Sequence, residues 1–298
     1  MTAVALPPTT PPPTPPPTTA AAARHERPSL LAPLTSQLLW LGRLVVFAVK
    51  VLIAVPLVFR RYRRELWRLV AEVTFGAGVL KVLASAVLVS AVLSATIGIQ
   101  IGLSGLQALK LVGLGPLAGL LSSFGNTREL APLIVAFGLA AQMGCRFTAQ
   151  LGAMRVTEEI DALEVMSIPS LAYLVSTRAV AALIAVGPLY LFALAGAYLA
   201  SQLTVVALAD QGSGTYIHYF DLFLNRTDVY YSVTKVIIFS VMVTILHCYY
   251  GFTASGGPEG VGVATGRAIR ASITSIAIVN MLLTLLFWGL STPAKLTA

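Results

Sequence analysis

Two groups of ionisable residues lie in or beside the long apolar runs of this 298-residue chain. The first is the adjacent pair Arg128 and Glu129, which stands in largely apolar sequence. Ionisable side chains are costly in hydrocarbon and are tolerated there when they face a protein interior or an aqueous path. The pair therefore indicates either an ion pair that fixes helices together or a polar site. In a polar site, Arg128 would attract an anionic group and Glu129 would orient it.

The second group is an acidic segment between two apolar runs. Thr157 is expected to cap a short helix whose first turns carry carboxylates, a placement that the helix dipole favours. The carboxylates are those of Glu158, Glu159, Asp161 and Glu164. The apolar residues are Ile160, Leu163, Val165 and Met166. Such a helix docks its apolar side into a partner's groove while its carboxylates meet basic residues at the rim. An ordinary solvated helix and a carboxylate metal site are the alternatives.

Catalytic and nucleotide-binding patterns are missing from the sequence. It has no GxxxxGK[ST] phosphate loop and no GxSxG nucleophile motif. Its three histidines, His25, His218 and His247, stand far apart and form no cluster with metal-ligand spacing. We therefore expect a protein that is not an enzyme and binds no cofactor itself. If ATP drives its action, another subunit must hydrolyse the nucleotide.

The composition places these residues in a membrane protein. The chain is 57% hydrophobic and 11% charged, which is more apolar surface than a soluble fold of this length buries. Nine of its Lys and Arg residues fall between positions 24 and 68 against two Glu, so that this block holds +7 of the net charge of +8. A basic block beside a membrane segment indicates a cytoplasmic flank rather than nucleic-acid binding. Cys145 and Cys248 lie in apolar stretches and are expected to pack as small apolar side chains.

The N-terminal part is expected to lie outside the bilayer core. Residues 1–35 begin with a run rich in Pro, Thr and Ala, and they predict a disordered cytoplasmic tail. Residues 38–59 are apolar for long enough to span a membrane, but basic side chains share one helical face and Pro56 interrupts the far end. We expect 36–68 to form an interfacial helix and basic flank. Its headgroup-contacting residues would be Arg43, Lys50, Arg60, Arg61, Arg63 and Arg64.

The rest of the chain predicts an all-α domain of five spans over 69–292, followed by a short tail, 293–298. The expected spans are 70–99, 111–145, 171–206, 229–252 and 271–290. Within the second, 111–124 is a candidate re-entrant piece. With a cytoplasmic N-terminus, loops 146–170 and 253–270 face the cytoplasm, and loop 207–228 and the C-terminus face out. GxxxG spacings at Gly98 and Gly102, and at Gly115 and Gly119, permit close helix contacts.

Three segments carry a family resemblance. RELAP at 128–132, QLGAMRVTEEIDALEVM at 150–166 and the Gly-rich GFTASGGPEGVGVATGRAIRAS at 251–272 resemble motifs of the MlaE/YrbE permeases, the membrane subunits of lipid-moving ABC transporters. The resemblance covers about 36–292. It implies one interfacial helix and five spans, and a coupling helix at 158–164 that seats in the ATPase. It also implies that Arg128 and Glu129 lie by the substrate cavity. The Gly-rich segment would be an irregular connection near the ATPase.

One departure refines the resemblance. Where these permeases commonly carry an AGRxGSA-like stretch, this chain has AAQMGCRFTA, with Gln142 in the arginine position and Arg146 four residues later. Together with the proline-rich tail, this is similar to the actinobacterial YrbE branch, and to the B-type paralogue of a permease heterodimer.

The implied partners are a second YrbE-type permease, an ABC ATPase dimer that binds ATP and Mg, and MCE-domain proteins on the outer side. The implied cargo is lipid, namely fatty acids, mycolic acids or sterols imported across the cell's inner membrane. No nucleic acid is expected among the partners. Two alternatives come from other classes. The first is a stand-alone ion- or proton-coupled carrier that uses Arg128 and Glu129 as its relay, and the second is a membrane scaffold. An inverted internal repeat would favour the carrier, and we see none in the sequence.

Overall fold

The computed structural model describes residues 32–75, 88–209 and 212–289 of the chain. Every secondary-structure element in these residues is helical, as predicted. The chain divides into two compact units, 1–42 and 43–298. Residues 1–31 of the predicted tail 1–35 lie outside the described residues. The last four residues of that predicted tail, 32–35, form the start of α1. The predicted C-terminal tail 293–298 also lies outside them.

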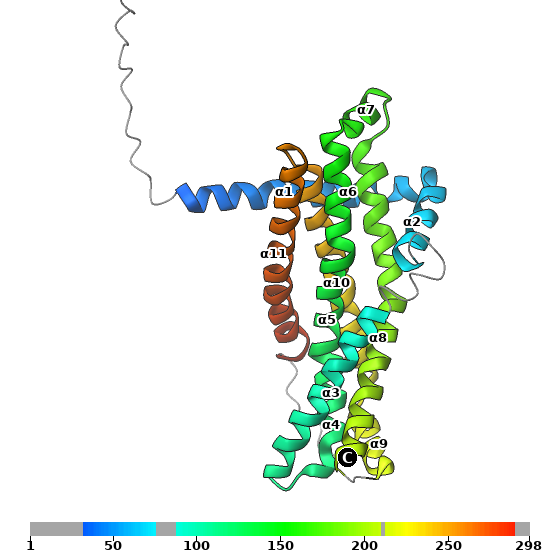
Figure 1. Ribbon diagram of the computed structural model, residues 1–298, viewed down its shortest axis with the longest axis vertical. Coiled ribbons are helices and arrows are strands. Elements are labelled where there is room, and N and C mark those ends of the chain that lie inside the picture. The colour runs from blue at the N-terminus through cyan, green and yellow to red at the C-terminus, as the bar shows by residue number, and fades with distance from the viewer. Residues whose placement is uncertain (1–31, 76–87, 210–211, 290–298) are drawn as a thin grey trace, which may run out of the picture. The chain divides into compact units, whose positions relative to one another are not determined.

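Most helices in the larger unit run alongside one another, and the chain passes back and forth between the two ends of the bundle (Figure 1). The N-terminal helices are α1 (Ala32–Arg61), α2 (Arg63–Phe75) and α3 (Leu88–Leu111). A long helical run follows, made of η2 (Gly115–Leu117), α4 (Ala118–Gly125), η3 (Asn126–Leu130), α5 (Ala131–Leu139), η4 (Ala140–Gly144) and α6 (Cys145–Val156). The remaining elements are α7 (Glu159–Val165), η5 (Leu171–Ser176), α8 (Thr177–Ala209), α9 (Ser213–Phe223), α10 (Arg226–Phe252), α11 (Gly257–Thr284) and η6 (Leu285–Gly289).

Six helical stretches in the described residues are long and apolar enough to cross a membrane. They cover residues 38–61, 89–111, 115–156, 171–207, 226–252 and 257–289. The chain is therefore a multi-pass membrane protein. Helices α2 and α7 lie toward one end of the bundle and α9 lies at the other, so the predicted cytoplasmic segments share an end (Figure 1).

The first of these stretches was expected to lie in the membrane interface. Its part within the larger unit, 43–61, crosses the long helices instead of running beside them (Figure 1). Arg43 and Lys50 are both exposed, as the shared helical face predicts. A crosswise helix with basic side chains on an exposed face suits the interface. Length and composition also allow a span, so the interfacial placement stays a prediction.

The boundaries of the first two predicted spans are wrong. The segment expected as 70–99 contains the end of α2, undescribed residues and only the first half of α3, which continues to Leu111. Helix α3 ends there because Gly113 adopts a left-handed conformation and Leu114 N donates to Leu109 O at 2.8 Å. This is a common glycine C-cap. The predicted re-entrant piece 111–124 is not separate, because α4 continues through α6 to Val156 as one helical run.

Two predicted loops are also shorter than expected. The loop 146–170 begins only after Val156, which places Arg146 in α6. The Gly-rich segment 251–272 is mostly helical, because α11 begins at Gly257. Gly256, in a left-handed conformation, is the N-cap, and Pro258 stands in the first turn, where its missing N–H costs nothing. Only residues 253–256 connect α10 to α11.

Glycines bring α3 against α8, as the GxxxG spacing predicted. A Cβ built on Gly98 would lie 2.3 Å from the Ala197 backbone oxygen, and one on Gly102 would lie 3.0 Å from Thr204 Cβ. Ser201 Oγ donates to Gly98 O at 2.7 Å across the same contact. In the second pair, Gly119 packs on α9, where an added Cβ would lie 2.4 Å from Tyr216 O. Small residues therefore set the approach of these helices.

Replacing Gly98 with alanine is expected to destabilise the bundle by roughly 1–3 kcal/mol, because the new methyl group would meet rigid backbone and push α3 from α8. The matched control is Gly187→Ala in α8, where nothing lies within 4 Å of the added Cβ. The control should be neutral or stabilising by about 0.5–1 kcal/mol. Thermal unfolding in detergent measures both, and equal melting temperatures for the two variants would contradict the packing account.

Candidate functional site

Charged and polar side chains from three helical runs meet inside the bundle. Arg128 and Glu129 stand in η3, a π-helical turn within the 115–156 run. Such turns add one residue to the helix and are frequent at functional sites. Asp228 and Lys235 come from α10. The third run contributes side chains at four-residue intervals, which share one helix face. They are Asn280, Thr284 and Trp288.

Arg128 and Glu129 do not pair with each other, since neighbouring residues on a helix point in different directions. Glu129 instead forms an ion pair with Lys235, at 3.2 Å between Oε1 and Nζ. Thr284 Oγ1 donates to the same carboxylate at 2.6 Å, and Asn280 Nδ2 donates to its other oxygen at 2.7 Å. The carboxylate therefore joins α10 and α11 to the 115–156 run.

Lys235 is the most deeply buried member of the site, with a side chain that is 0% exposed. Its ammonium group donates to Arg128 O at 2.8 Å and to Thr284 Oγ1 at 2.9 Å, as well as to Glu129. An ammonium group has three hydrogens, and each has an acceptor here. This satisfies a charge that would otherwise be strongly unfavourable inside a membrane domain.

Arg128 forms the second ion pair, with Asp228. Its Nη2 and Nε both donate to Asp228 Oδ2, at 2.8 and 3.2 Å, and Trp288 Nε1 donates to Oδ1 at 2.7 Å. The guanidinium group also lies over the Phe124 ring, 3.9 Å from its centroid. Arg128 and Asp228 therefore hold the start of α10 to the 115–156 run and to η6, which follows α11.

Trp288 connects the two ion pairs. Its ring centroid lies 5.3 Å from Arg128 Cζ and 5.1 Å from Lys235 Nζ, distances at which a cation is attracted to an aromatic face. Tyr231 stacks on Phe287 at 4.7 Å and meets Trp288 edge-on at 5.6 Å, which supports the indole ring. The two pairs therefore form one unit, called here the charged site: Arg128, Glu129, Asp228, Lys235, Asn280, Thr284 and Trp288.

The charged site is balanced and partly accessible. Its two cations and two carboxylates sum to zero, so it presents no net charge. The side chains of Arg128 and Glu129 are 30% and 33% exposed, whereas those of Asp228 and Lys235 are 9% and 0% exposed. The buried α10 residues, Asp228 and Lys235, thus neutralise the charges of the two η3 residues, which lie at the accessible edge of the site. This arrangement can bind a polar or zwitterionic group by exchanging one of the internal ion pairs.

Asp228→Asn tests the second ion pair. We expect it to destabilise the chain by about 2 kcal/mol, because Arg128 would lose its counter-ion while its partly exposed side chain keeps some hydration. The amide oxygen can still accept from Trp288, so shape is nearly conserved. Asp221→Asn on the exposed side of α9 removes the same charge and should have no effect. Chemical unfolding in one detergent compares them, and equal stability would show that the pair contributes nothing.

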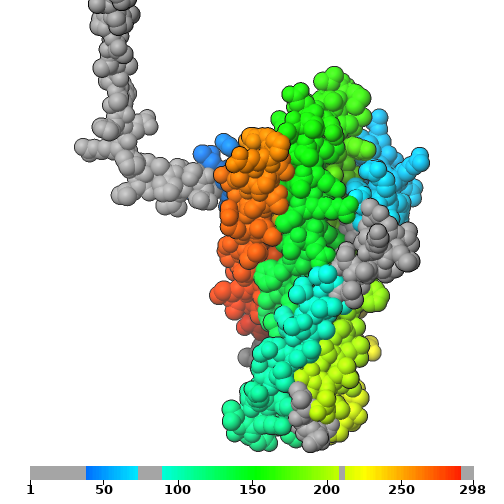
Figure 2. All heavy atoms as spheres, in the orientation of Figure 1, coloured from blue at the N-terminus to red at the C-terminus, as the bar shows by residue number. Residues whose placement is uncertain are grey.

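Helix α7 is the predicted short acidic helix, at the end of the bundle where the α6–α7 segment projects in green at the top of Figure 2. The four carboxylate residues are all exposed or partly exposed. Three of them have partners in the chain: Arg155 pairs with Asp161 at 2.6 Å, Ser170 Oγ donates to Glu164 at 2.7 Å, and Thr157 Oγ1 donates to Glu159 Oε1 at 3.1 Å. Glu158, Glu159 and Glu164 form no ion pair with any described residue, so the uncompensated negative charge of this surface lies on them.

Two details of the predicted acidic helix are wrong. Thr157 does not cap it; Thr157 ends α6, and Glu158, in a left-handed conformation, is the N-cap of α7. Ile160 is 0% exposed and packs into the core of its own chain, so it is not available to a partner. Leu163 packs against the same core. The exposed apolar residues are those at the C-terminal end, Val165 and Met166.

The remaining predicted residues lie at separate places. All six basic residues of the interfacial segment are exposed. Arg146 forms an ion pair with Glu72, and Gln142 is partly buried in η4. Cys145 and Cys248 are free, and Cys248 packs in the core. Among the described residues, no group of three His, Cys, Asp or Glu side chains is placed to hold a metal ion.

Sequence reasoning missed five members of the charged site, namely Asp228, Lys235, Asn280, Thr284 and Trp288. Two signals point to them. Lys235 is the only charged residue in the apolar run 229–252. In the last run, an amide, a hydroxyl and an indole recur every four residues on one helix face. The pairing itself joins residues far apart in the chain and follows only from the fold.

Comparison with known proteins identifies relatives. Residues 75–286 match the protein family described as Permease MlaE. A probable ABC transporter permease protein of Rickettsia bellii is 35% identical over 162 residues, 54% of this chain and 62% of the relative. Another from Synechocystis is 33% identical over 172 residues, 56% of this chain and 64% of the relative. The chloroplastic protein TRIGALACTOSYLDIACYLGLYCEROL 1 of Arabidopsis thaliana is 28% identical over 177 residues, 59% of this chain and 51% of the relative. The matches thus span about half to two thirds of each relative.

Proposed function

Because the chain belongs to the Permease MlaE family, we propose that it forms the transmembrane lipid path of an ABC transporter and that a separate ATPase drives it. The observation that carries this proposal is the charged site, which keeps two ion pairs inside a membrane domain and leaves Arg128 and Glu129 partly accessible. Ionisable groups at such depth commonly mark a substrate or ion path. A lipid with a polar headgroup and apolar chains matches a charged site in apolar surroundings.

Relatives support both halves of the proposal. The Rickettsia and Synechocystis proteins are named as probable ABC transporter permeases. The name of the Arabidopsis protein contains that of a galactolipid, which favours a lipid as cargo. In this chain, Arg128 would contact an anionic headgroup and Glu129 would orient it, in exchange for their contacts with α10 and α11.

The ATPase would dock at α7, where Glu158 and Glu159 offer uncompensated negative charge beside exposed Val165 and Met166. A basic rim with an apolar groove on the ATPase is complementary to this surface. ATP and Mg would then be bound by the ATPase. With α7 in the cytoplasm, the N-terminus is cytoplasmic as well, and α9 and the C-terminus face outward across the inner membrane.

The complete transporter would also contain a second YrbE-type permease and MCE-domain proteins on the outer side, and it would import its lipid. The two permeases would alternate between arrangements as the ATPase dimer closes. A stand-alone carrier would instead use the charged site as a relay, and a scaffold would need no path at all.

Purification of the tagged full-length chain from its own cells in mild detergent tests the assembly. We expect an ATPase, a second permease and MCE-domain proteins in the same peak, identified by mass spectrometry. A tagged, unrelated multi-pass protein from the same membranes is the control for carry-over. A chain that comes out alone, under conditions that preserve other membrane complexes, would contradict the ABC proposal and favour the carrier.

A further inference from the structure

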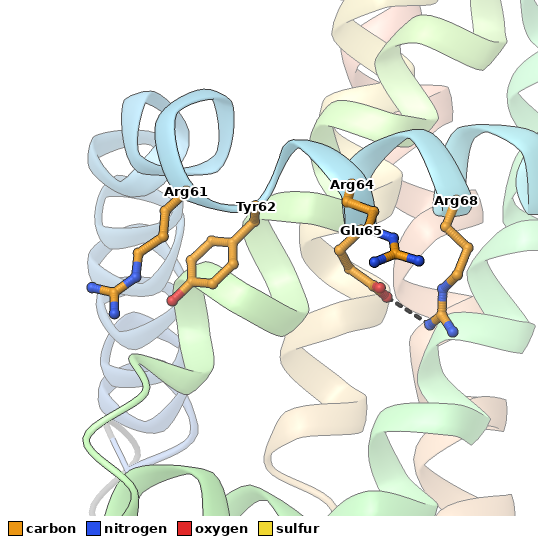
Figure 3. A pocket seen from close by; sticks show the side chains of 5 residues that line it. All are labelled: Arg61, Tyr62, Arg64, Glu65 and Arg68. Atoms are coloured by element: carbon orange, nitrogen blue, oxygen red, sulfur yellow. Dashed lines mark hydrogen bonds and ion pairs between the residues drawn. The ribbon is translucent and has the colours of Figure 1, made fainter.

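A pocket of about 650 Å³ lies where α1 ends and α2 begins. Its lining comes from one short stretch of chain and consists of Arg61, Tyr62, Arg64, Glu65 and Arg68. Figure 3 shows that these five side chains extend to the same side of the α1–α2 segment. The pocket is remote in sequence from the charged site and shares no residue with it.

The lining is strongly basic. Glu65 pairs with Arg68 at 2.6 Å, and this pair neutralises one of the three guanidinium groups that line the pocket. Arg61 and Arg64 form no ion pair with any described residue. The pocket therefore holds a net charge of +2 on two uncompensated arginines, with the Tyr62 hydroxyl beside them as a hydrogen-bond donor.

The opposite side of the segment is firmly packed, which holds the pocket in shape. Val58, Leu66, Leu69 and Val70 are buried together against Val180 and Ala181 of α8. The backbone bonds from Tyr62 N to Val58 O, at 3.0 Å, and from Leu66 N to Tyr62 O, at 2.9 Å, carry the helical pattern through the junction. The Tyr62 ring meets Tyr173 edge-on at 5.2 Å. The arginines thus extend from a fixed backbone, and a bound ligand would lose little free energy in ordering it.

Two further features indicate what kind of anion fits. A guanidinium fork matches a phosphate group and binds it with two parallel hydrogen bonds. The volume is larger than an inorganic phosphate needs, which leaves room for a glycerol or other headgroup. Phe59, just before the lining residues in the chain, and Trp67, which stands among them, are 49% and 60% exposed. Exposed aromatic side chains beside basic ones are typical of the membrane–water interface.

We propose that this pocket is a binding site for the phosphate headgroup of an anionic phospholipid, with Arg61 and Arg64 as its phosphate ligands. The lipid's chains would lie along the exposed apolar side of α1. This site is independent of the proposed lipid path and of the ATPase, and it would fix the α1–α2 junction at the membrane surface. It differs from diffuse basic attraction because two particular arginines are required.

Neighbouring residues supply a matched control. Arg60 and Arg63 are exposed and have the same type and spacing as Arg61 and Arg64, but they do not line the pocket. The variants R61Q/R64Q and R60Q/R63Q therefore remove equal charge from the same segment. The variant R61K/R64K keeps the charge and removes the guanidinium forks. Thermal unfolding confirms that each remains folded.

Native mass spectrometry of the full chain in detergent measures binding of short-chain phosphatidylglycerol, with phosphatidylcholine as the zwitterionic comparison. We expect phosphatidylglycerol to bind at least roughly tenfold more tightly, R61Q/R64Q to abolish that preference, R61K/R64K to weaken it, and R60Q/R63Q to keep it within about twofold. Equal losses in both glutamine pairs would show diffuse attraction and overturn the proposal. Inorganic phosphate that displaces the lipid at an equal concentration would assign the site to a free anion instead. None of these results depends on transport or on an ATPase.

Discussion

Replacing Lys235 with methionine is expected to destabilise the folded chain by about 3 kcal/mol, the low end of the range for removing one partner of a buried ion pair. Methionine is similar in length and apolar, so the change mainly removes charge. Glu129 would lose its counter-ion, and Arg128 O and Thr284 Oγ1 would lose a donor. The low end applies because the Glu129 side chain is 33% exposed and keeps some hydration. Chemical unfolding in detergent measures the loss.

The double variant E129Q/K235M separates the charge effect from a packing effect. Neutralising Glu129 removes the uncompensated carboxylate, so the double variant should recover at least half of the stability that K235M loses. A double variant no more stable than K235M would show that the loss arises from packing or hydrogen bonds alone. The ion-pair account would then be wrong.

The same residues distinguish a structural site from a path. Glu129→Gln keeps the side-chain shape, and its amide oxygen still accepts from Lys235 or Thr284. We expect it to lose about 2–3 kcal/mol of stability, because the buried Lys235 loses its counter-ion, but to stay folded in the membrane. We also expect it to lose most lipid transport, because the residue can no longer exchange a charged partner during passage. A scaffold, or a site that only joins helices, would tolerate this change with transport intact.

The second large effect is expected at α7. Reversing Glu158 and Glu159 to lysine should weaken ATPase binding at least roughly a hundredfold, since like charges placed across an interface cost several kcal/mol. Both side chains are exposed and form no ion pair with the described residues, so the chain should remain folded in the membrane. Pull-down of the ATPase with the tagged permease measures binding, and unfolding temperature verifies the fold.

Asp221→Lys, on α9 at the opposite end of the bundle, is the control for a reversed exposed charge. It should leave ATPase binding unchanged. Retention of the ATPase by E158K/E159K would remove the coupling role from α7. Loss in both variants would point to a general effect of charge on assembly.

The sequence predicted the ends of some helices well and misplaced the ends of others. The apolar runs expected at 171–206 and 229–252 correspond closely to α8 with η5 and to α10, because charged or polar residues border both runs. The first two spans were misplaced because small and apolar residues continue across the α3–α4 turn. The turn between those helices depends on the left-handed Gly113, whose conformation cannot be read from composition.

The candidate site was predictable from the sequence only in part. Arg128 and Glu129 stood out because two charges together are rare in an apolar run. Their partners did not, since Asp228 was expected in a loop and Lys235 was a single charge in a span. The burial of Ile160 was misjudged because the same residue type can occupy either an exposed or a buried position on a short helix. The packing of α7 on its own bundle decides between them.

In the proposed mechanism, lipid at the charged site is coupled to ATP hydrolysis through α7. The most direct test of this coupling is ATP hydrolysis by the co-purified complex in proteoliposomes, measured with and without added lipid. We predict that lipid stimulates hydrolysis in the wild type, that Glu129→Gln abolishes the stimulation while the ATPase stays bound, and that E158K/E159K loses the ATPase itself. Hydrolysis that is indifferent to lipid and unchanged by Glu129→Gln would contradict the mechanism.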